Sequence, residues 1–251
     1  MELLPLRTQP PQTPTYRRHN PSYLARKGGY QEYKPCLRWD FGFICAFCLL
    51  HEVDICPQGT SGLPVFSAEH LDLQSTDDQK ANDYGNVVYA CSFCNTARRS
   101  KPRVTPEARL LDPTKDVWAQ HFRNQENYLV PQEHDADAIY THEAYDLDDD
   151  RKVARRETRY ETLSANVKII KEGLAFLKEL FDRVGKNPDK FFIETIRQLR
   201  ASILQALKNL EPYAAIPKDA PTQCRCRTRD MHSLPEEFAK QIMQISSPAS
   251  V

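Results

Sequence analysis

Apolar side chains follow a helical pattern over the C-terminal part of the chain, where they recur at alternating steps of three and four residues. The first stripe consists of Val167, Ile170, Leu174, Leu177, Phe181 and Val184. The second stripe consists of Phe192, Ile196, Leu199, Ile203, Leu207 and Leu210. At this spacing the members of a stripe share one face of an α-helix. The pattern therefore predicts two amphipathic helices in succession.

The residues that flank these stripes predict where the helices begin and end. Gly185 suits the position just after the first helix, and Asn187 with Pro188 suits the start of the second. Pro212 is expected to end the second helix because proline has no backbone N–H to donate. Residues 163–212 should therefore form an antiparallel helical hairpin. Its apolar seam would either fold back on the rest of the chain or pair with a second chain, as a homodimer or with a partner protein.

The N-terminal half contains short segments that are typical of strands. Residues 64–74 are predicted to form a strand, because residues such as Val65 favour β-structure. The polar residues 75–85 predict a loop, and Asn86 to Ala90 a second short strand. Ser92 to about Ser100 then predict a short helix. The expected order is strand, loop, strand and helix.

These patterns divide an α+β chain into five segments. Residues 1–38 are rich in Pro, Arg and Tyr and predict an extended basic arm, and residues 39–130 should form a core with an extension that packs on it. Residues 131–162 predict an exposed, charged connection to the hairpin at 163–212, and residues 213–251 an irregular tail. The aromatic anchors expected for the extension are Trp118, Phe122 and Tyr128. With 251 residues, 40% of them hydrophobic, the chain can bury one core and a second small one.

Charge is balanced over the whole chain but unevenly distributed along it. Lys and Arg number 34, as do Asp and Glu, so the formal net charge is zero. Residues 1–38 contain seven basic and two acidic side chains, whereas residues 132–150 contain eight acidic side chains and no Lys or Arg. A neutral total argues against a protein that coats nucleic acid nonspecifically. The uneven distribution still allows a basic side that faces DNA and an acidic side that faces away.

Neither the apolar runs nor the N-terminus predicts a membrane or secreted protein. No apolar run approaches the ~18 residues that a membrane span requires. The first residues lack the apolar core of a secretory signal. The expectation is a cytoplasmic protein without membrane contact. Thiols stay reduced in the cytosol, which favours metal binding over disulfides for paired cysteines.

Two C-x2-C pairs, Cys45 with Cys48 and Cys91 with Cys94, are the strongest candidates for metal ligands. Each pair can supply half of a tetrahedral four-thiolate site, which suits zinc. Protein sulfurs would fill all four positions, so this zinc would be structural rather than catalytic. The alternative is that the two pairs belong to unrelated turns. A C-x-C segment at 224–226 is a weaker candidate for a metal half-site, and free thiols are the simpler interpretation there.

This segment of the chain resembles the HNH endonucleases, also called His-Me finger or ββα-metal nucleases, in their zinc-stapled form. The family pattern is a C-x2-C pair, an acid-histidine pair at a strand end, an asparagine before a second strand, and C-x2-C-N followed by a basic residue. The matching residues are Cys45, Cys48, Glu69, His70, Asn86, Cys91, Cys94, Asn95 and Lys101. Residues 111–122 are similar to a segment that follows the nuclease core in many members. The resemblance implies a zinc-stapled ββα-metal (HNH) core, to which the helical hairpin is attached.

The resemblance also implies roles for individual polar residues. His70 would be the general base that activates water, because imidazole titrates near neutral pH. Glu69 and Asn95 would hold a catalytic Mg²⁺ or Mn²⁺, and Asn86 would orient the loop and His70. Taken alone, a histidine near a strand end or an asparagine at a strand start is ordinarily structural. The chain departs from the family pattern at Glu69, where Asp is commonest, and at Leu73, where proline is frequent.

Basic residues follow the second cysteine pair directly, namely Arg98, Arg99, Lys101 and Arg103. Such residues are ordinary on an exposed helix face. Their position just after Asn95 favours contacts with nucleic-acid phosphates, so they are the predicted nucleic-acid-binding residues.

These features predict a metal-dependent DNA endonuclease that hydrolyses phosphodiester bonds. By resemblance it would leave a 5′-phosphate and a 3′-hydroxyl, and would nick one strand or, as a dimer, cleave both. Small members of the family are common in bacteria and phages, which favours a role in restriction or antiviral defence by analogy. The alternative is a catalytically weakened, zinc-dependent DNA-binding or scaffold protein, which the departures at Glu69 and Leu73 support.

Overall fold

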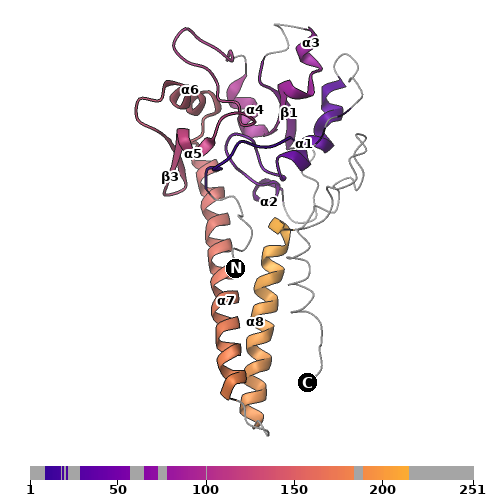
Figure 1. Ribbon diagram of the computed structural model, residues 1–251, viewed down its shortest axis with the longest axis vertical. Coiled ribbons are helices and arrows are strands. Elements are labelled where there is room, and N and C mark those ends of the chain that lie inside the picture. The colour runs from indigo at the N-terminus through magenta and orange to yellow at the C-terminus, as the bar shows by residue number, and fades with distance from the viewer. Residues whose placement is uncertain are drawn as a thin grey trace. The chain divides into compact units, whose positions relative to one another are not determined.

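The computed structural model describes residues 9–17, 19, 21, 29–56, 65–72, 78–99, 101–183 and 189–214. Within these residues the chain is a mixed α+β protein with two small antiparallel sheets and a C-terminal pair of helices (Figure 1). The described residues fall into two compact units, one up to Thr158 and one from Arg159 onward. The expected α+β class and the C-terminal helical pair are confirmed.

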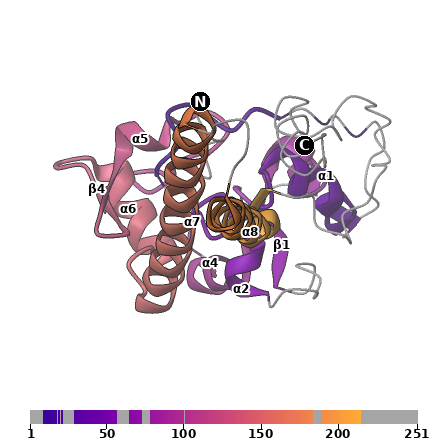
Figure 2. The same ribbon diagram turned by 90° about the horizontal axis from the view of Figure 1, so that it is seen from below.

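The first unit contains the predicted succession of strand, strand and helix. Strand β1 (Phe66–His70) pairs with β2 (Val87–Cys91) in antiparallel register, with Glu69 opposite Val88. Helix α4 (Ser92–Arg98) follows β2 without an intervening residue. Figures 1 and 2 show α4 lying between β1 and helix α6 (Ala136–Tyr145).

The segment between the two strands is not only the loop that its polarity predicted. It also contains α3 (Asp78–Ala81) and the 3₁₀-helix η3 (Tyr84–Asn86). Asp83 caps η3, because its side chain accepts a hydrogen bond from the backbone N–H of Gly85. Polar composition does not distinguish a loop from such single turns, which local hydrogen bonds stabilise. The strand predicted over 64–74 was too long, because Val65, Leu71 and Asp72 are described and lie outside β1; positions 64, 73 and 74 lie outside the described residues.

Residues at the end of the predicted N-terminal arm belong instead to the core of the first unit. They form the 3₁₀-helix η1 (Gly29–Tyr33) and helix α1 (Lys34–Asp40). Tyr33 and Leu37, one helical turn apart, are 2% and 0% exposed. Arg38, expected to be part of a basic arm, is buried and forms two hydrogen bonds of 2.9 and 2.8 Å with the Glu52 carboxylate. The prediction that residues up to 38 form an extended arm is therefore wrong.

The described residues that precede η1 also contact the first unit. Thr15 donates a backbone hydrogen bond of 2.7 Å to Pro113, and Arg17 Nη2 donates one of 2.7 Å to the carbonyl of Val87. The Arg17 guanidinium lies 5.0 Å from the centre of the Tyr84 ring. This arginine therefore fastens the N-terminal segment to the start of β2 rather than extending into solvent.

The acidic stretch that was predicted to be an exposed connection is partly a buried helix. Asp135 caps α6 by accepting a hydrogen bond from Ala138 N. Ala138, Thr141 and Tyr145 of α6 are each 0% exposed. The expectation was wrong because most of the acidic side chains lie on the outer face or at helix starts, and average composition hides the buried face.

A second sheet completes the first unit. Helix α5 (Trp118–His121) leads into β3 (Phe122–Gln125), which pairs with β4 (Tyr128–Pro131). Trp118 and Phe122 are buried as predicted, whereas Tyr128 is 38% exposed. Leu129 is buried in its place, because neighbouring residues of a strand point to opposite faces.

Among the described residues, the second unit consists of α7 (Asp150–Arg183) from Arg159 onward together with α8 (Lys190–Ala214). Helix α7 begins well before residue 163, where the first apolar stripe was expected to start. Helix α8 includes Pro212, so the prediction that this proline stops the helix is wrong. Pro212 removes only one backbone hydrogen bond of the helix, and α8 ends two residues later. Gly185, Asn187 and Pro188 lie outside the described residues.

Contacts between the two helices show that they are antiparallel. Asn166 accepts a hydrogen bond of 3.0 Å from Asn209 Nδ2, whereas Gly173, further along α7, faces Ile203, which lies earlier in α8. A Cβ atom on Gly173 would lie 2.8 Å from Ile203 Cγ1. The absence of a side chain at residue 173 thus lets the helices approach closely. None of the helices in the described ranges combines the length and the apolar character that a membrane crossing requires.

This close approach predicts that Gly173→Leu destabilises the second unit. A larger side chain must displace Ile203, and overpacking of this kind costs about 1–3 kcal/mol in the free energy of unfolding. The measurement is urea denaturation followed by circular dichroism. Ala175→Leu, at an exposed position of the same helix, is the matched control and should leave the midpoint nearly unchanged. Equal midpoints for the two variants would show that the helices do not meet at residue 173.

Candidate functional site

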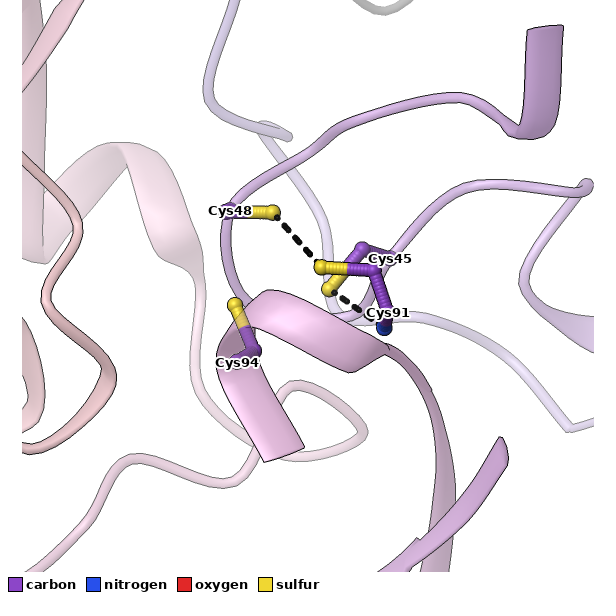
Figure 3. Close-up of side chains that lie close together, drawn as sticks. All are labelled: Cys45, Cys48, Cys91 and Cys94. Carbon is purple, nitrogen blue, oxygen red and sulfur yellow. Dashed lines mark hydrogen bonds between the residues drawn. The ribbon is translucent and has the colours of Figure 1, made fainter. Parts of the chain in front are cut away.

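The four cysteines of the two C-x2-C pairs come together in the first unit, as predicted (Figure 3). Cys45 and Cys48 lie in the turn that follows α1, whereas Cys91 ends β2 and Cys94 lies in the first turn of α4. All four are buried, and their sulfur atoms lie within 4.8 Å of one another. A tetrahedron with Zn–S bonds of about 2.3 Å separates its sulfurs by about 3.8 Å. The donor set and its spacing therefore fit a metal ion such as zinc.

Backbone contacts hold the Cys45–Cys48 turn against the segment that carries Cys91 and Cys94. Ala46 N donates to the carbonyl of Tyr89 over 2.8 Å, which fastens the first turn to β2. Leu49 adopts a φ of +61°, so that the chain can reverse directly after Cys48. The backbone N–H of Cys91 points at the sulfur of Cys45 over 3.4 Å. The fold thus places the Cys45–Cys48 turn against the junction of β2 and α4, which carries Cys91 and Cys94.

The thiols differ in how readily they ionise. Burial opposes ionisation of Cys45, but hydrogen bonds from the other cysteines and from the Cys91 backbone lower its pKa on balance. Burial raises the pKa of Cys94. Four buried thiols cannot all ionise without a compensating charge, and a divalent cation supplies it.

Arg156, on the first turns of α7, supports the cluster from outside. It is only 3% exposed, and its guanidinium donates to the backbone carbonyls of Cys48, Asn127 and Leu147 at 3.2, 2.7 and 3.1 Å. One side chain therefore connects the first cysteine turn with the β3–β4 turn and with the segment before α7. Nothing in the spacing of the sequence indicated this role.

The predicted metal ligands Glu69, on β1, and Asn95, on α4, lie over the same face of β1. Strand alternation puts Ser67 and Glu69 on the same face, and Asn95 Nδ2 donates to Ser67 Oγ over 2.9 Å. Burial raises the pKa of Glu69 to about 7, and the Arg98 guanidinium, 3.2 Å from its Oε1, opposes that rise. Ser67 was not singled out from the sequence, although its position two residues before Glu69 on a strand would have identified it.

Arg98 lies inside the protein rather than on its surface. It is 0% exposed, and besides Glu69 its guanidinium donates to the backbone carbonyls of His70 and Leu71. It also lies 5.9 Å from the centre of the Tyr145 ring. Arg98 therefore does not present its charge to solvent, contrary to the phosphate contact predicted from its place in the sequence. Instead it connects α4 to the end of β1 and to α6.

His70 leaves β1 on the face opposite to Glu69. Its Nε2 lies 2.8 Å from the carbonyl oxygen of Ala81, and its ring centre lies 4.2 Å from that of Tyr30. A carbonyl only accepts hydrogen bonds, so Nε2 carries the proton and Nδ1 keeps its lone pair. Burial lowers the pKa of His70, although the hydrogen bond to Ala81 opposes this. The imidazole is therefore neutral at pH 7 and has a nitrogen that can accept a proton.

Asn86 connects the two sides of the segment between the strands. Its Oδ1 accepts from the backbone N–H of Asp72 at 2.8 Å, and its Nδ2 donates to the carbonyls of Asp72 and Lys80 at 3.1 and 3.0 Å. Lys80 directly precedes Ala81, the partner of His70. Asn86 therefore connects Asp72, just after β1, to Lys80, the neighbour of the residue that holds the imidazole.

The other basic residues of the predicted cluster differ in their surroundings. Arg103 forms ion pairs with Asp72 and Asp112 at 3.1 and 3.3 Å, so its charge is neutralised. Lys101 is exposed and its Nζ donates to the carbonyl of Glu143 over 2.8 Å. Arg99 is exposed at the end of α4. Within the predicted set, only Arg99 and Lys101 keep a charge without a carboxylate partner among the described residues.

Comparison of the chain with models of protein families, with curated proteins and with solved structures found no match. Any assignment of function must therefore come from two features of the first unit. One is the cysteine cluster, and the other is the set of polar residues at the end of β1 and on α4.

The cysteine cluster predicts one tightly bound zinc ion per chain. Cys94→Ser should reduce zinc content to near zero and lower the free energy of unfolding by several kcal/mol, because metal affinity and folding are coupled. Cys36→Ser is the matched control, since Cys36 is equally buried but lies outside the cluster. Zinc is measured by atomic emission on the purified protein. Full zinc content in Cys94→Ser would contradict the site.

Proposed function

We propose that the β1–β2–α4 segment is the core of an HNH-type, metal-dependent endonuclease that hydrolyses phosphodiester bonds in DNA. The observation that carries this proposal is the arrangement around the end of β1. A hairpin and helix that carry two of the four clustered cysteines bring a carboxylate and an amide, Glu69 and Asn95, to one face. The next residue, His70, is a neutral imidazole held by a backbone carbonyl.

Glu69 and Asn95 would hold Mg²⁺ or Mn²⁺, which prefer oxygen ligands. When bound, such an ion stabilises negative charge on the phosphate and on the leaving oxygen. The amide nitrogen of Asn95 donates a hydrogen bond to Ser67, so the amide oxygen is the atom that could bind a metal. In Glu69, Oε1 already accepts from Arg98, and Oε2 has no hydrogen-bond partner among the described residues. Each predicted ligand therefore has one oxygen to offer.

His70 would take the proton of the attacking water at Nδ1. The Ala81 carbonyl fixes the proton on Nε2, which leaves the lone pair on the other nitrogen. Because neighbouring residues leave a strand on opposite faces, the imidazole and the Glu69 carboxylate would approach a phosphate that lies across the end of β1 from two sides. Asn86 would keep the loop, and hence the imidazole, in place.

A second candidate function is a zinc-dependent DNA-binding or scaffold protein without hydrolytic activity. The observation that favours it is the Arg98–Glu69 ion pair, because a guanidinium already lies where a metal would need the carboxylate. The 6% exposure of His70 points the same way. A mobility shift of DNA without cleavage in Mg²⁺ or Mn²⁺ would support this candidate.

Plasmid cleavage tests the proposal. In Mg²⁺ or Mn²⁺ the wild-type protein should convert supercoiled plasmid to nicked circles, and His70→Ala should reduce that rate by about 10²–10⁴-fold, the usual contribution of a general base. His142→Ala is the control, on α6 of the same unit. Equal rates for wild type and His70→Ala, with zinc content unchanged, would rule out the assignment of His70.

The same assay reports on a second copy of the chain. One chain carries one such core, so linear product requires two cuts. We propose that two copies pair through the helical hairpin, where Phe176, Phe181 and Phe191 are 46%, 57% and 82% exposed. Linear product from a protein that light scattering shows to be monomeric would argue against this pairing.

Metal binding should depend on pH because Glu69 must lose its proton to act as a ligand. The raised pKa of about 7 means that the carboxyl is largely protonated below that pH. Affinity for Mn²⁺ should therefore rise about tenfold per pH unit as pH approaches 7 from below, and then level off. The zinc-loaded protein suits this titration, because thiolates prefer zinc to manganese.

Binding is measured by the electron paramagnetic resonance signal of free Mn²⁺. Glu69→Gln should bind weakly and without this rise, whereas Glu107→Gln, at an exposed position of the same unit, should behave like wild type. Manganese affinity in Glu69→Gln equal to that of wild type at pH 8 would exclude Glu69 as a ligand.

A further inference from the structure

Two arginines of α7 converge on an aromatic ring beside the cysteine cluster. The guanidinium carbons of Arg151 and Arg155 lie 5.1 and 5.4 Å from the centre of the Phe93 ring. Phe93 stands on α4 directly before the cluster residue Cys94. The two arginines are one helical turn apart, so both charges are held over the same small area of the first unit.

The two arginines differ in how their charge is compensated. Arg151 forms hydrogen bonds of 3.0 and 2.6 Å with the Asp149 carboxylate, and these bonds hold the pKa of Asp149 at about 2. Arg155 has no hydrogen bond or ion pair with any described residue, and its Nε is buried without a partner. A guanidinium has five N–H donors, and a buried donor without an acceptor is costly. The outer nitrogens Nη1 and Nη2 of Arg155 are not among these buried atoms, so they are the donors that a ligand could reach.

The surroundings of this pair favour contact with one anionic group of a ligand over contact with a row of such groups. Asp148 and Asp150 are exposed close to Arg151 in the sequence, and together with Asp149 they weaken the field on that side. Arg155 lies one turn further along α7, where the next residues, Arg156 and Glu157, are buried and exposed respectively. The main contact should accordingly come from Arg155, with a smaller share from Arg151.

We infer that Arg155, assisted by Arg151, binds a phosphate of the nucleic-acid backbone. The planar guanidinium matches two phosphate oxygens, and stacking on Phe93 fixes its orientation. This inference rests on the proposed function in that it takes nucleic acid as the ligand. It moves the backbone contact away from Arg98 and Arg103, which already pair with carboxylates of the protein.

The bound phosphate would be a neighbour of the cleaved one rather than the cleaved one itself. Phe93 and Asn95 are two residues apart on α4, and such residues point to opposite sides of a helix. A helix with its side chains is about 10 Å across, so a strand that reaches both sides must present different phosphates to them. Arg155 is thus a binding residue and does not touch the reacting atoms.

The test is a titration of fluorescent duplex DNA with the zinc-loaded full chain, followed by anisotropy over a series of salt concentrations. Ca²⁺ replaces Mg²⁺ and Mn²⁺, so that the DNA is not consumed. Arg155→Gln should weaken binding several-fold and reduce the slope of log affinity against log salt by about 1, the value for one lost phosphate contact. Arg151→Gln should reduce the slope by less, because Asp149 already compensates that charge.

Two further variants separate binding from folding. Arg155→Lys keeps the charge and should keep the slope, and Arg123→Gln, an exposed arginine on β3, should match wild type in affinity and slope. The inference is overturned if Arg155→Gln keeps the wild-type slope, even when its thermal midpoint falls, or if Arg123→Gln loses as much affinity. It is also overturned if the wild-type chain does not bind duplex DNA.

The DNA-binding and plasmid assays together show whether the inference about Arg155 or the proposed nuclease function fails. Binding that depends on Arg155, without plasmid cleavage in Mg²⁺ or Mn²⁺, supports the inference and contradicts the nuclease. Plasmid cleavage with unaltered DNA binding by Arg155→Gln supports the nuclease and contradicts the inference.

Discussion

The first unit depends on the meeting of four buried sulfurs from two distant parts of the chain. One pair lies in a tight turn after α1, and the other spans the junction of β2 and α4. Two short strands and a helix of seven residues bury too little apolar surface to be stable alone. A shared metal ion would convert the two halves into one cross-linked element, and the buried Arg156 connects this element to the β3–β4 turn.

This cross-link has a direct consequence for the polar residues nearby. Cys94 fixes the start of α4, so the next residue and the residue one turn later, Asn95 and Arg98, lie over Ser67 and Glu69 of β1. The Arg98 guanidinium then holds the end of the strand through two backbone carbonyls. A small displacement of α4 would therefore alter the carboxylate, the amide and the strand end together. The proposed chemistry and the stability of the unit share the same contacts.

The position of a basic residue in the sequence does not indicate whether its charge is compensated in the folded first unit. Of the arginines that follow the second cysteine pair, Arg98 and Arg103 are engaged with carboxylates, so they contribute to cohesion more than to an external field. Arg155, which has no hydrogen bond or ion pair with any described residue, comes instead from the start of α7, more than fifty residues later in the chain than α4. A surface that attracts phosphates would thus be assembled from separate elements, with the cysteine cluster as the common support.

The sequence alone determined the features that depend on local spacing. The two C-x2-C pairs predicted that their cysteines meet, the apolar stripes predicted α8 and the C-terminal part of α7, and the order of strand, strand and helix followed from short local patterns. Tertiary structure decided what local spacing does not contain. Arg98 and Arg38 look like surface cations in the sequence, yet partners far away in the chain bury them. Strand alternation shows that adjacent residues 69 and 70 point apart, but only the packed fold decides which elements cover each face. Burial and charge compensation arise from contacts between distant residues, and the spacing of neighbours along the chain carries no record of them.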